Sequence, residues 1–197
     1  MSNIPMPGRL IAVVGPSGVG KDTVMAALAA AHSNIRLARR VITRPSGVGG
    51  EASKGVTETE FATLQAKGAF AFSWSAHGLQ YAIPSEAIAL TQGRRTPDGR
   101  TMGGYDVLVN FSRAVLPEVA KRVPDFLVLS LTANPDELAA RLTMRGRENT
   151  ADITDRLRRA AFTIAPGLNV VEIANDGPLE ITVQTALSAI YAKRAQR

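Results

Sequence analysis

A glycine-rich segment between an apolar run and a helix-like run constrains this chain more than any other feature. The segment is Gly15-Pro16-Ser17-Gly18-Val19-Gly20-Lys21-Asp22-Thr23, and it follows the apolar residues 10–14, LIAVV. A strand, a glycine loop and a helix in this order form the context of a phosphate-binding P-loop. The glycines let backbone N–H groups turn inward around a polyphosphate, and the helix N-terminus adds partial positive charge. Residues 15–23 therefore predict a nucleotide-phosphate site.

The last three residues of the segment predict how it would hold a nucleotide and its metal. Lys21 is expected to reach the β- and γ-phosphates as a point charge. Where the usual pattern has a hydroxyl for Mg²⁺, this chain has Asp22, with Thr23 one residue later. A carboxylate can hold Mg²⁺ directly or through water, although beside phosphates it also repels them. Asp22 and Thr23 are therefore both candidate magnesium ligands.

The composition limits the remaining chemistry. The chain has 197 residues, is 45% hydrophobic, and contains no cysteine and two histidines. This length fits one domain with a substantial core, and no apolar run approaches the about 20 residues of a membrane span. The absence of cysteine excludes disulfides and thiolate chemistry, and two histidines argue against a zinc site. The first residues lack the apolar core of a signal peptide, so we expect a cytoplasmic protein with no membrane partner.

The net charge of +6 predicts anionic partners. The arginines that carry it form two clusters, Arg36, Arg39, Arg40 and Arg44, and then Arg141, Arg145, Arg147, Arg156, Arg158 and Arg159. Neither cluster is interleaved with the aromatic residues that a base-stacking surface would use. Small phosphorylated substrates are therefore favoured, and nonspecific binding of nucleic acid by a basic surface is the alternative.

The rest of the chain alternates between strand-like and helix-like segments. Strands are expected at residues 9–14, 36–43, 105–110, 126–131 and 170–174, and helices at 21–31, 58–67, 84–92, 112–122, 135–145, 152–164 and 179–194. This alternation predicts an α/β fold with a parallel sheet covered on both faces. Residues 69–75 and 79–83 flank His77-Gly78 and predict a β-hairpin. Residues 93–104 are basic and turn-rich, which predicts a solvated loop.

The hairpin region looks like an insertion on this core. We expect a single domain of residues 1–197, with a core of residues 1–38 and 105–197 and an acceptor-binding insertion of about 39–93. Phosphoryl transfer depends mostly on positioning and on neutralisation of charge. Guanidinium groups match phosphate oxygens, so the arginines near Arg44 are candidates to bind an acceptor. Arg141, Arg145 and Arg147 sit one turn apart at a helix end, and Gly146 could serve as the hinge of a short lid at about 141–150.

No residue stands out as a general base. A phosphate acceptor needs none, because the second pKa of a phosphate monoester is about 6 and the group is already a dianion at neutral pH. A hydroxyl acceptor would instead need a carboxylate, and Asp22 or Asp106 would have to serve. The sequence therefore favours a phosphate group as acceptor.

Further motifs along nearly the whole chain, read together, carry a family resemblance. Thr43-Arg44-Pro45, Gly50-Glu51, His77-Gly78, Tyr81, Arg141-Leu142-x-x-Arg145-Gly146-Arg147 and Asn175-Asp176 follow the P-loop in the order seen in guanylate kinases. Several details are more similar to ribose 1,5-bisphosphate phosphokinases: Lys21-Asp22, residues 39–45 (RRVITRP), residues 73–79 (SWSAHGL), residues 107–114 (VLVNFSRA) and Arg145-Gly146-Arg147-Glu148. The resemblance implies a P-loop NTPase of guanylate-kinase-like fold, with three layers, a parallel sheet, an inserted hairpin region and a lid.

The resemblance also implies an activity and a set of site residues. That family moves the γ-phosphoryl group of ATP, with Mg²⁺, onto the 1-phosphate of ribose 1,5-bisphosphate, yielding phosphoribosyl diphosphate in phosphonate breakdown. The implied catalytic residues are Lys21, Arg145 and Arg147, and residues 15–23 with Arg141 would bind the nucleotide. The implied acceptor-binding residues are Arg40, Arg44, Glu51, Tyr81, Asn110 and Arg156.

Departures from guanylate kinases fit an acceptor without a base. Gly47 stands where those enzymes carry a second arginine, and residues 56–60 contain no tyrosine. Phe111 and Ala82 stand where the phosphokinases are expected to have glycine. Two alternatives stay open beside the phosphokinase: a guanylate or other nucleoside monophosphate kinase, and a non-catalytic guanylate-kinase-like interaction module. The sequence does not indicate an oligomeric state.

Overall fold

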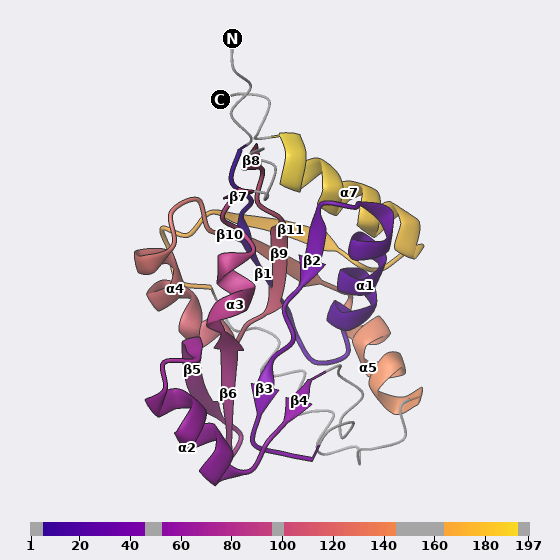
Figure 1. Cartoon of the computed structure of the whole chain (residues 1–197). Helices are drawn as coiled ribbons and strands as arrows, with labels where there is room; N and C mark the ends of the chain where they lie inside the picture. Colours follow the sequence, from indigo (N-terminus) through magenta and orange to yellow (C-terminus); the bar gives the residue numbers. More distant parts are fainter. Residues whose placement is uncertain (1–5, 46–52, 96–100, 145–163, 193–197) are drawn as a thin grey trace.

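A five-stranded parallel sheet lies at the centre of the structure, which is a computed structural model describing residues 6–45, 53–95, 101–144 and 164–192 (Figure 1). The strand order is β11 (Val170–Ala174), β10 (Leu127–Thr132), β1 (Leu10–Val14), β9 (Asp106–Asn110) and β2 (Ile35–Leu37). Ala12 of β1, for example, pairs in parallel with Val128 on one side and Val109 on the other. The parallel sheet predicted from the alternation of strands and helices is thereby confirmed.

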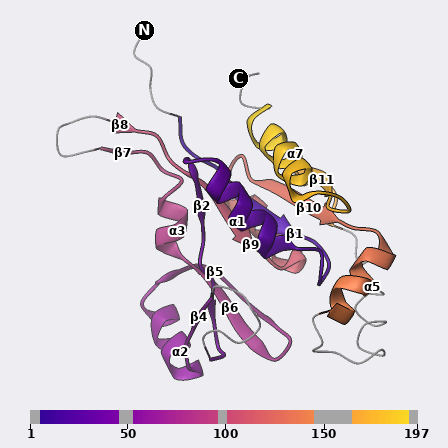
Figure 2. The ribbon, with the colours of Figure 1, turned by 90° about the vertical axis from the view of Figure 1, so that its right-hand side faces the viewer.

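Helices cover both faces of this sheet, which explains why its middle strand β1 is apolar throughout. All five residues of β1 are buried, and successive side chains point to opposite faces. Ile11 and Val13 pack in the core under α1 (Lys21–Ala31) and α7 (Leu179–Ala192), which lie side by side (Figure 2). Leu10, Ala12 and Val14 pack on the other face, against α4 (Leu116–Arg122). The helix α5 (Pro135–Met144) follows β10.

A four-stranded sheet forms the inserted region, in the order β4 (Lys54–Gly55), β3 (Val41–Ile42), β6 (Leu79–Pro84) and β5 (Phe70–Ala76). The predicted hairpin is confirmed as β5 and β6, and its turn residues His77 and Gly78 both have positive φ. The helix α2 (Glu58–Ala66) begins at a capping box made by Thr57 and Glu60. The bounds given above for the core and the insertion stay predictions.

The prediction of one strand over residues 36–43 is wrong. This segment contributes β2 to the central sheet and β3 to the inserted sheet, and the chain leaves the first sheet after Ala38, whose N–H donates to the Leu108 carbonyl at 2.9 Å. Between the two strands stand Arg39 and Arg40, whose charged ends are costly to bury inside a central sheet. Periodicity alone cannot tell which partner strand each half of such a segment will meet.

Two predicted helix starts are also wrong, and in both cases a proline is the reason. Pro84 is not the first helical residue but the last paired residue of β6, opposite Phe70, so α3 spans only Ser85–Ala89. The helix expected from residue 112 starts instead as a 3₁₀ turn, η1 (Arg113–Val115). Pro117 has no N–H to donate to the Arg113 carbonyl, which explains why the α-helical bonding begins later.

The basic segment of residues 93–104 is more ordered at its ends than the predicted solvated loop. β7 (Arg94–Arg95) pairs with β8 (Thr101–Met102), while residues 96–100 lie outside the described part of the chain. The helix predicted over residues 152–164 lies almost wholly outside it as well. No helix in the described ranges is both long enough and apolar enough to cross a membrane.

Candidate active site

The P-loop leaves the carboxyl end of β1, the middle strand of the central sheet, and leads into α1. Gly15, Gly18 and Gly20 have φ values of 151°, 86° and 90°, a region that residues with a Cβ rarely adopt. A Cβ on Gly15 would also lie 2.5 Å from the Leu131 carbonyl oxygen of β10. The glycines are therefore required by the backbone path, which wraps N–H groups around the start of α1.

Lys21 lies across this loop. Its Nζ donates hydrogen bonds to the carbonyls of Gly15 at 2.9 Å and Pro16 at 3.0 Å. Both carbonyls belong to the loop that would surround a phosphate. The ammonium charge of Lys21 therefore lies beside the expected phosphate site. The left-handed glycines, the helix start and this cation together fit a polyphosphate.

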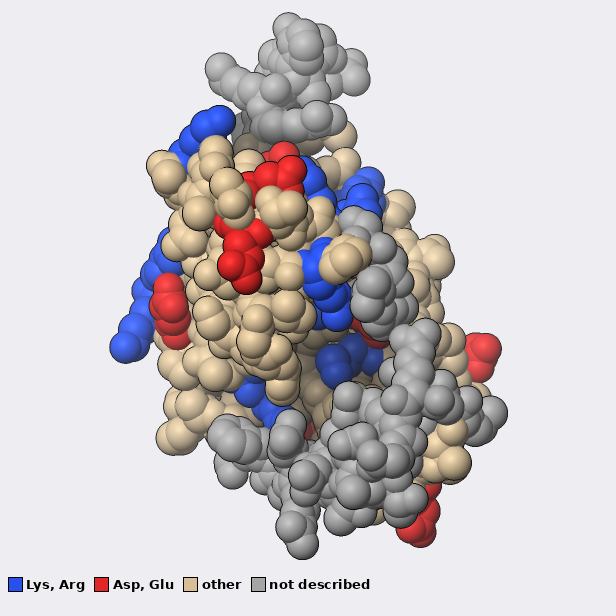
Figure 3. Space-filling model, turned by 90° about the horizontal axis from the view of Figure 1, so that it is seen from below, with Lys and Arg blue, Asp and Glu red and all other residues tan. Residues whose placement is uncertain are grey.

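A cavity of about 590 Å³ opens over the P-loop and extends to the inserted sheet. Many predicted site residues line it, namely Gly15, Pro16, Ser17, Gly18, Gly20, Lys21, Asp22, Thr23, Arg40, Tyr81 and Asn110. Figure 3 shows Lys and Arg side chains inside the hollow of the face seen from below. The structure thus brings the candidate nucleotide site and three candidate acceptor residues to one cavity.

A chain of polar contacts runs from the inserted sheet to the start of α1. Arg40 lies over the Tyr81 ring at 5.2 Å, and its Nη1 donates to the Asn110 carbonyl at 3.0 Å. The Asn110 side chain in turn donates from Nδ2 to Asp22 Oδ1 at 3.3 Å. Arg40 is thereby held close to the loop end of the cavity, and the Asp22 carboxylate has an oriented partner.

The cavity also has an aromatic wall that the sequence-based site prediction missed. Trp74 of β5 stacks on Tyr81 of β6, with ring centroids 5.5 Å apart and planes 8° from parallel. Phe111, which is 4% exposed, packs against Trp74 at 5.8 Å. Trp74 and Phe111 lie within residues 73–79 and 107–114, two of the segments that carry the family resemblance, and this was the signal that could have found them.

Arg113 is a second missed residue of the cavity. It stands at the start of η1 and is half-buried, and this burial lowers the pKa of its guanidinium. The group stays charged at neutral pH, because an arginine does not lose its proton in proteins. A partly desolvated cation therefore faces the same cavity as the P-loop.

Of the remaining predicted residues, Val19, Arg44 and Arg141 are described, and none of them lines the cavity. Val19 is fully buried in the core beside α1. Glu51, Arg145, Arg147 and Arg156, together with most of the predicted lid, lie outside the described residues. Their assigned roles stay predictions.

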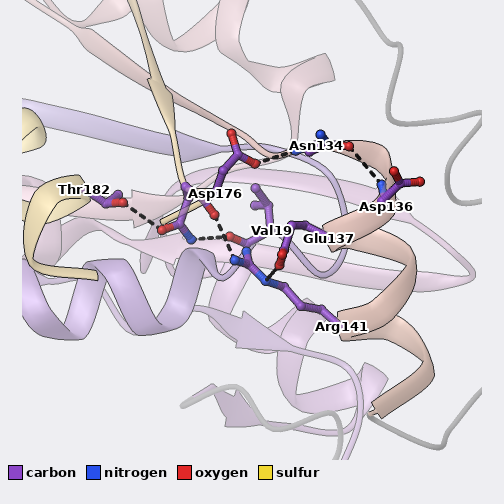
Figure 4. A network of polar contacts seen from close by, with 8 residues as sticks. Val19, Asn134, Asp136, Glu137, Arg141, Asp176 and Thr182 are labelled. Carbon is purple, nitrogen blue, oxygen red and sulfur yellow. Dashed lines mark hydrogen bonds and ion pairs between the residues drawn. The ribbon is translucent and has the colours of Figure 1, made fainter. Parts of the chain in front are cut away.

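A polar network behind the P-loop fixes its position (Figure 4). Asn175, which follows β11, donates from Nδ2 to the Val19 carbonyl at 2.7 Å and accepts at Oδ1 from the Thr182 hydroxyl at 2.8 Å. Its carbonyl accepts from Arg141 Nη2 at 2.9 Å, and Arg141 pairs with Glu137 at 3.4 Å. Arg141 therefore links α5 to the P-loop through Asn175.

Replacement of Asn175 by alanine should weaken this support. The Val19 carbonyl and the Thr182 hydroxyl would each lose a buried partner, which should lower the free energy of unfolding by about 2 kcal/mol. Thr185→Ala is the matched control, because Thr185 also donates at 2.8 Å on α7, but to the exposed Ile181 carbonyl of its own helix. Chemical denaturation measures both variants, and equal losses would contradict a special role for Asn175.

Comparison with known proteins finds relatives that match most of the chain. A protein of Ruegeria sp. (strain TM1040) described as ribose 1,5-bisphosphate phosphokinase PhnN is 45% identical over 192 residues, covering 97% of this chain and 96% of its own. A protein of the same description from Pseudomonas fluorescens (strain SBW25) is 45% identical, covering 94% and 96%. A bifunctional ribose 1,5-bisphosphokinase-thymidine phosphorylase of Cupriavidus necator is 41% identical over 175 residues, which are 27% of that protein. No protein-family model matches the chain.

Among solved structures, the guanylate kinase from Anaplasma phagocytophilum has a similar fold. The TM-score is 0.62 at 17% identity, and the match covers 96% of this chain and 87% of that one. A gluconokinase from Sinorhizobium meliloti 1021 matches with a TM-score of 0.54 at 18% identity, covering 98% and 95%. These likenesses confirm the predicted guanylate-kinase-like α/β fold.

Proposed function

This chain belongs to the family of ribose 1,5-bisphosphate phosphokinases, and we propose on that basis that it transfers the γ-phosphoryl group of ATP to the 1-phosphate of ribose 1,5-bisphosphate. The products are ADP and 5-phosphoribosyl 1-diphosphate. The observation that carries the proposal is the single cavity shared by the P-loop and by Arg40, Tyr81 and Asn110. A donor and an acceptor can meet there without a change of site, in the cytoplasm, where ATP is available.

The acceptor phosphate itself supplies the nucleophile. One of its oxygens attacks the γ-phosphorus, the bond from that phosphorus to the β–γ bridging oxygen breaks, and this oxygen leaves with ADP. No proton has to be removed, because a phosphate monoester is already a dianion at neutral pH. Asp22 is the one carboxylate lining the cavity among the described residues, and Asn110 donates to it. Asp106 is buried at the amino end of β9, away from the P-loop.

Residues of this chain bind and neutralise the reacting groups. Backbone N–H groups of the P-loop bind the donor phosphates, and Lys21 exchanges its contacts with the Gly15 and Pro16 carbonyls for phosphate oxygens. Arg40 binds the acceptor phosphate beside Asp22, because its contact with the Asn110 carbonyl keeps it at the loop end of the cavity. These cations let two anionic phosphates approach each other. Neutralisation of their charge is the main contribution of the chain to catalysis.

Asp22 and Thr23 fit a magnesium ion. Both line the cavity at the first turn of α1, and both offer the oxygen ligands that Mg²⁺ prefers together with substrate phosphates. When bound, Mg²⁺ neutralises charge that develops on the phosphate oxygens. The hydrogen bond from Asn110 would orient the Asp22 carboxylate for this role.

An assay of ADP release with a panel of acceptors tests the proposal. We expect Mg-ATP turnover with ribose 1,5-bisphosphate and none above background with GMP or ribose 5-phosphate. Trp74 and Phe111 line the cavity beside Tyr81, and two groups with which guanylate kinases are expected to read the purine are missing, at Gly47 and in residues 56–60. Turnover of GMP alone would contradict the proposal and establish a nucleoside monophosphate kinase.

A further inference from the structure

Arg113 lines the active-site cavity, and the phosphoryl transfer described above assigns it no role. The proposed acceptor carries two phosphates, of which one reacts while the other has to be bound without reacting. A site for the second phosphate needs a cation away from the P-loop. Among the described residues of the cavity, the arginines are Arg40 and Arg113, so the question is which phosphate each one holds.

The contacts of Arg40 assign it to the reacting end. Its Nη1 donates to the Asn110 carbonyl, and Asn110 Nδ2 donates to Asp22 in the first turn of α1. Arg113 comes from a different element, η1, on the way to α4. The two arginines therefore reach the cavity from different elements, and Arg113 takes no part in the hydrogen bonds that tie Arg40 to Asn110 and Asn110 to Asp22.

The backbone at Arg113 is fixed by its neighbours. The Leu116 N–H donates to the Arg113 carbonyl, and the Val115 N–H donates to the Ser112 carbonyl at 3.1 Å. Val115 and Leu116 are buried in the core under the central sheet, so η1 is anchored on its inner side. The point at which the Arg113 side chain leaves the backbone is therefore fixed at the edge of the cavity.

The environment of Arg113 also favours a phosphate. Partial burial takes the guanidinium out of water, and a charge in a less polar environment attracts an opposite charge more strongly. Its planar fork can donate two parallel hydrogen bonds to phosphate oxygens. Phe111 and Trp74 contribute the apolar part of the same cavity, against which a sugar ring could pack.

We propose that Arg113 binds the non-reacting 5-phosphate of ribose 1,5-bisphosphate and thereby selects acceptors with a phosphate at both ends. This inference rests on the proposed function. It predicts that the loss of Arg113 weakens binding of the 5-phosphate of the acceptor. Binding of the 1-phosphate and of ATP should be unaffected.

The test compares Arg113→Met with the wild type by using ribose 5-phosphate and ribose 1-phosphate as competitive inhibitors against ribose 1,5-bisphosphate. We expect the KM for ribose 1,5-bisphosphate and the Ki for ribose 5-phosphate to rise about 10- to 100-fold, since a charge-assisted contact is lost. The Ki for ribose 1-phosphate and the KM for ATP should stay within about twofold. Arg122→Met is the matched control, because Arg122 is an exposed arginine of α4, paired with Glu118, outside the cavity.

A second variant, Arg113→Lys, keeps the charge and loses the fork, so it should raise the same two constants by several-fold. If Arg113→Met does not fold, the constants of Arg113→Lys alone test whether Arg113 binds the 5-phosphate. An equal rise of both inhibition constants would place Arg113 at the reacting phosphate, and unchanged acceptor constants would remove it from the acceptor site. Either result overturns the inference about Arg113. The proposed function would still hold in both cases, provided that the wild type turns over ribose 1,5-bisphosphate. A wild type without that turnover would instead contradict the proposed function.

Discussion

Replacement of Lys21 by methionine should lower kcat about 1,000-fold, the largest effect expected of any single side chain in the described site. Methionine has a similar length but no charge, so the γ-phosphate would lose the cation that the loop holds closest to it. The variant should stay folded, because the hydrogen bonds from Lys21 to Gly15 and Pro16 are with loop carbonyls and Lys21 is not part of the apolar core. Steady-state ADP release and thermal unfolding measure the two effects separately.

The matched control for this prediction is Lys67→Met, because Lys67 is an exposed lysine at the end of α2 and does not line the cavity. It should keep wild-type kcat. If Lys21→Met retained full turnover, the P-loop would not be the site of phosphoryl transfer. If the wild type itself bound no ATP, the alternative of a non-catalytic interaction module would gain support.

Replacement of Gly15 by alanine should abolish tight binding of ATP. The added Cβ would lie 2.5 Å from the Leu131 carbonyl oxygen, and the φ of 151° would strain any side chain. The first turn of the loop would have to move away from β10, which would misdirect the N–H groups that bind phosphate. We expect at least about a 100-fold increase in the Kd for ATP, together with a loss of about 2 kcal/mol in the free energy of unfolding.

Gly167→Ala separates backbone strain from this steric effect. Gly167 also has a left-handed φ, of 84°, but an added Cβ would meet nothing within 4 Å. This control should lose about 1 kcal/mol of stability and keep its affinity for ATP. Isothermal titration with ATP measures both variants, and equal affinities for Gly15→Ala and wild type would contradict the loop geometry described here.

Local chemistry explains why the centre of the fold could be predicted. The strands β1 and β10 are mostly apolar because they are buried on both faces, and a P-loop needs its glycines at fixed spacing. The hairpin β5–β6 was equally visible, because its turn and its alternation lie within 15 residues of chain. Each of these features depends on neighbours in the sequence.

What the sequence did not predict depends on partners far apart in the chain. The Val19 carbonyl is held by Asn175, 156 residues later, and the wall of Trp74 forms only when Phe111 meets it. The division of residues 36–43 between two sheets likewise follows from the strands that each half meets, β9 for one and β6 for the other. Arg113 lies within residues 107–114, which carry the family resemblance, but only the position of η1 shows that it lines the cavity.

The central claim is that a phosphate oxygen, and not a hydroxyl, attacks the donor, so that no general base is needed. Phosphorus-31 NMR of the product from Mg-ATP and ribose 1,5-bisphosphate tests this claim directly. We predict two new mutually coupled resonances of a diphosphate at C1 and an unchanged monoester at C5. A third, uncoupled monoester resonance on the ribose would mean that a hydroxyl had been phosphorylated, and it would contradict the account.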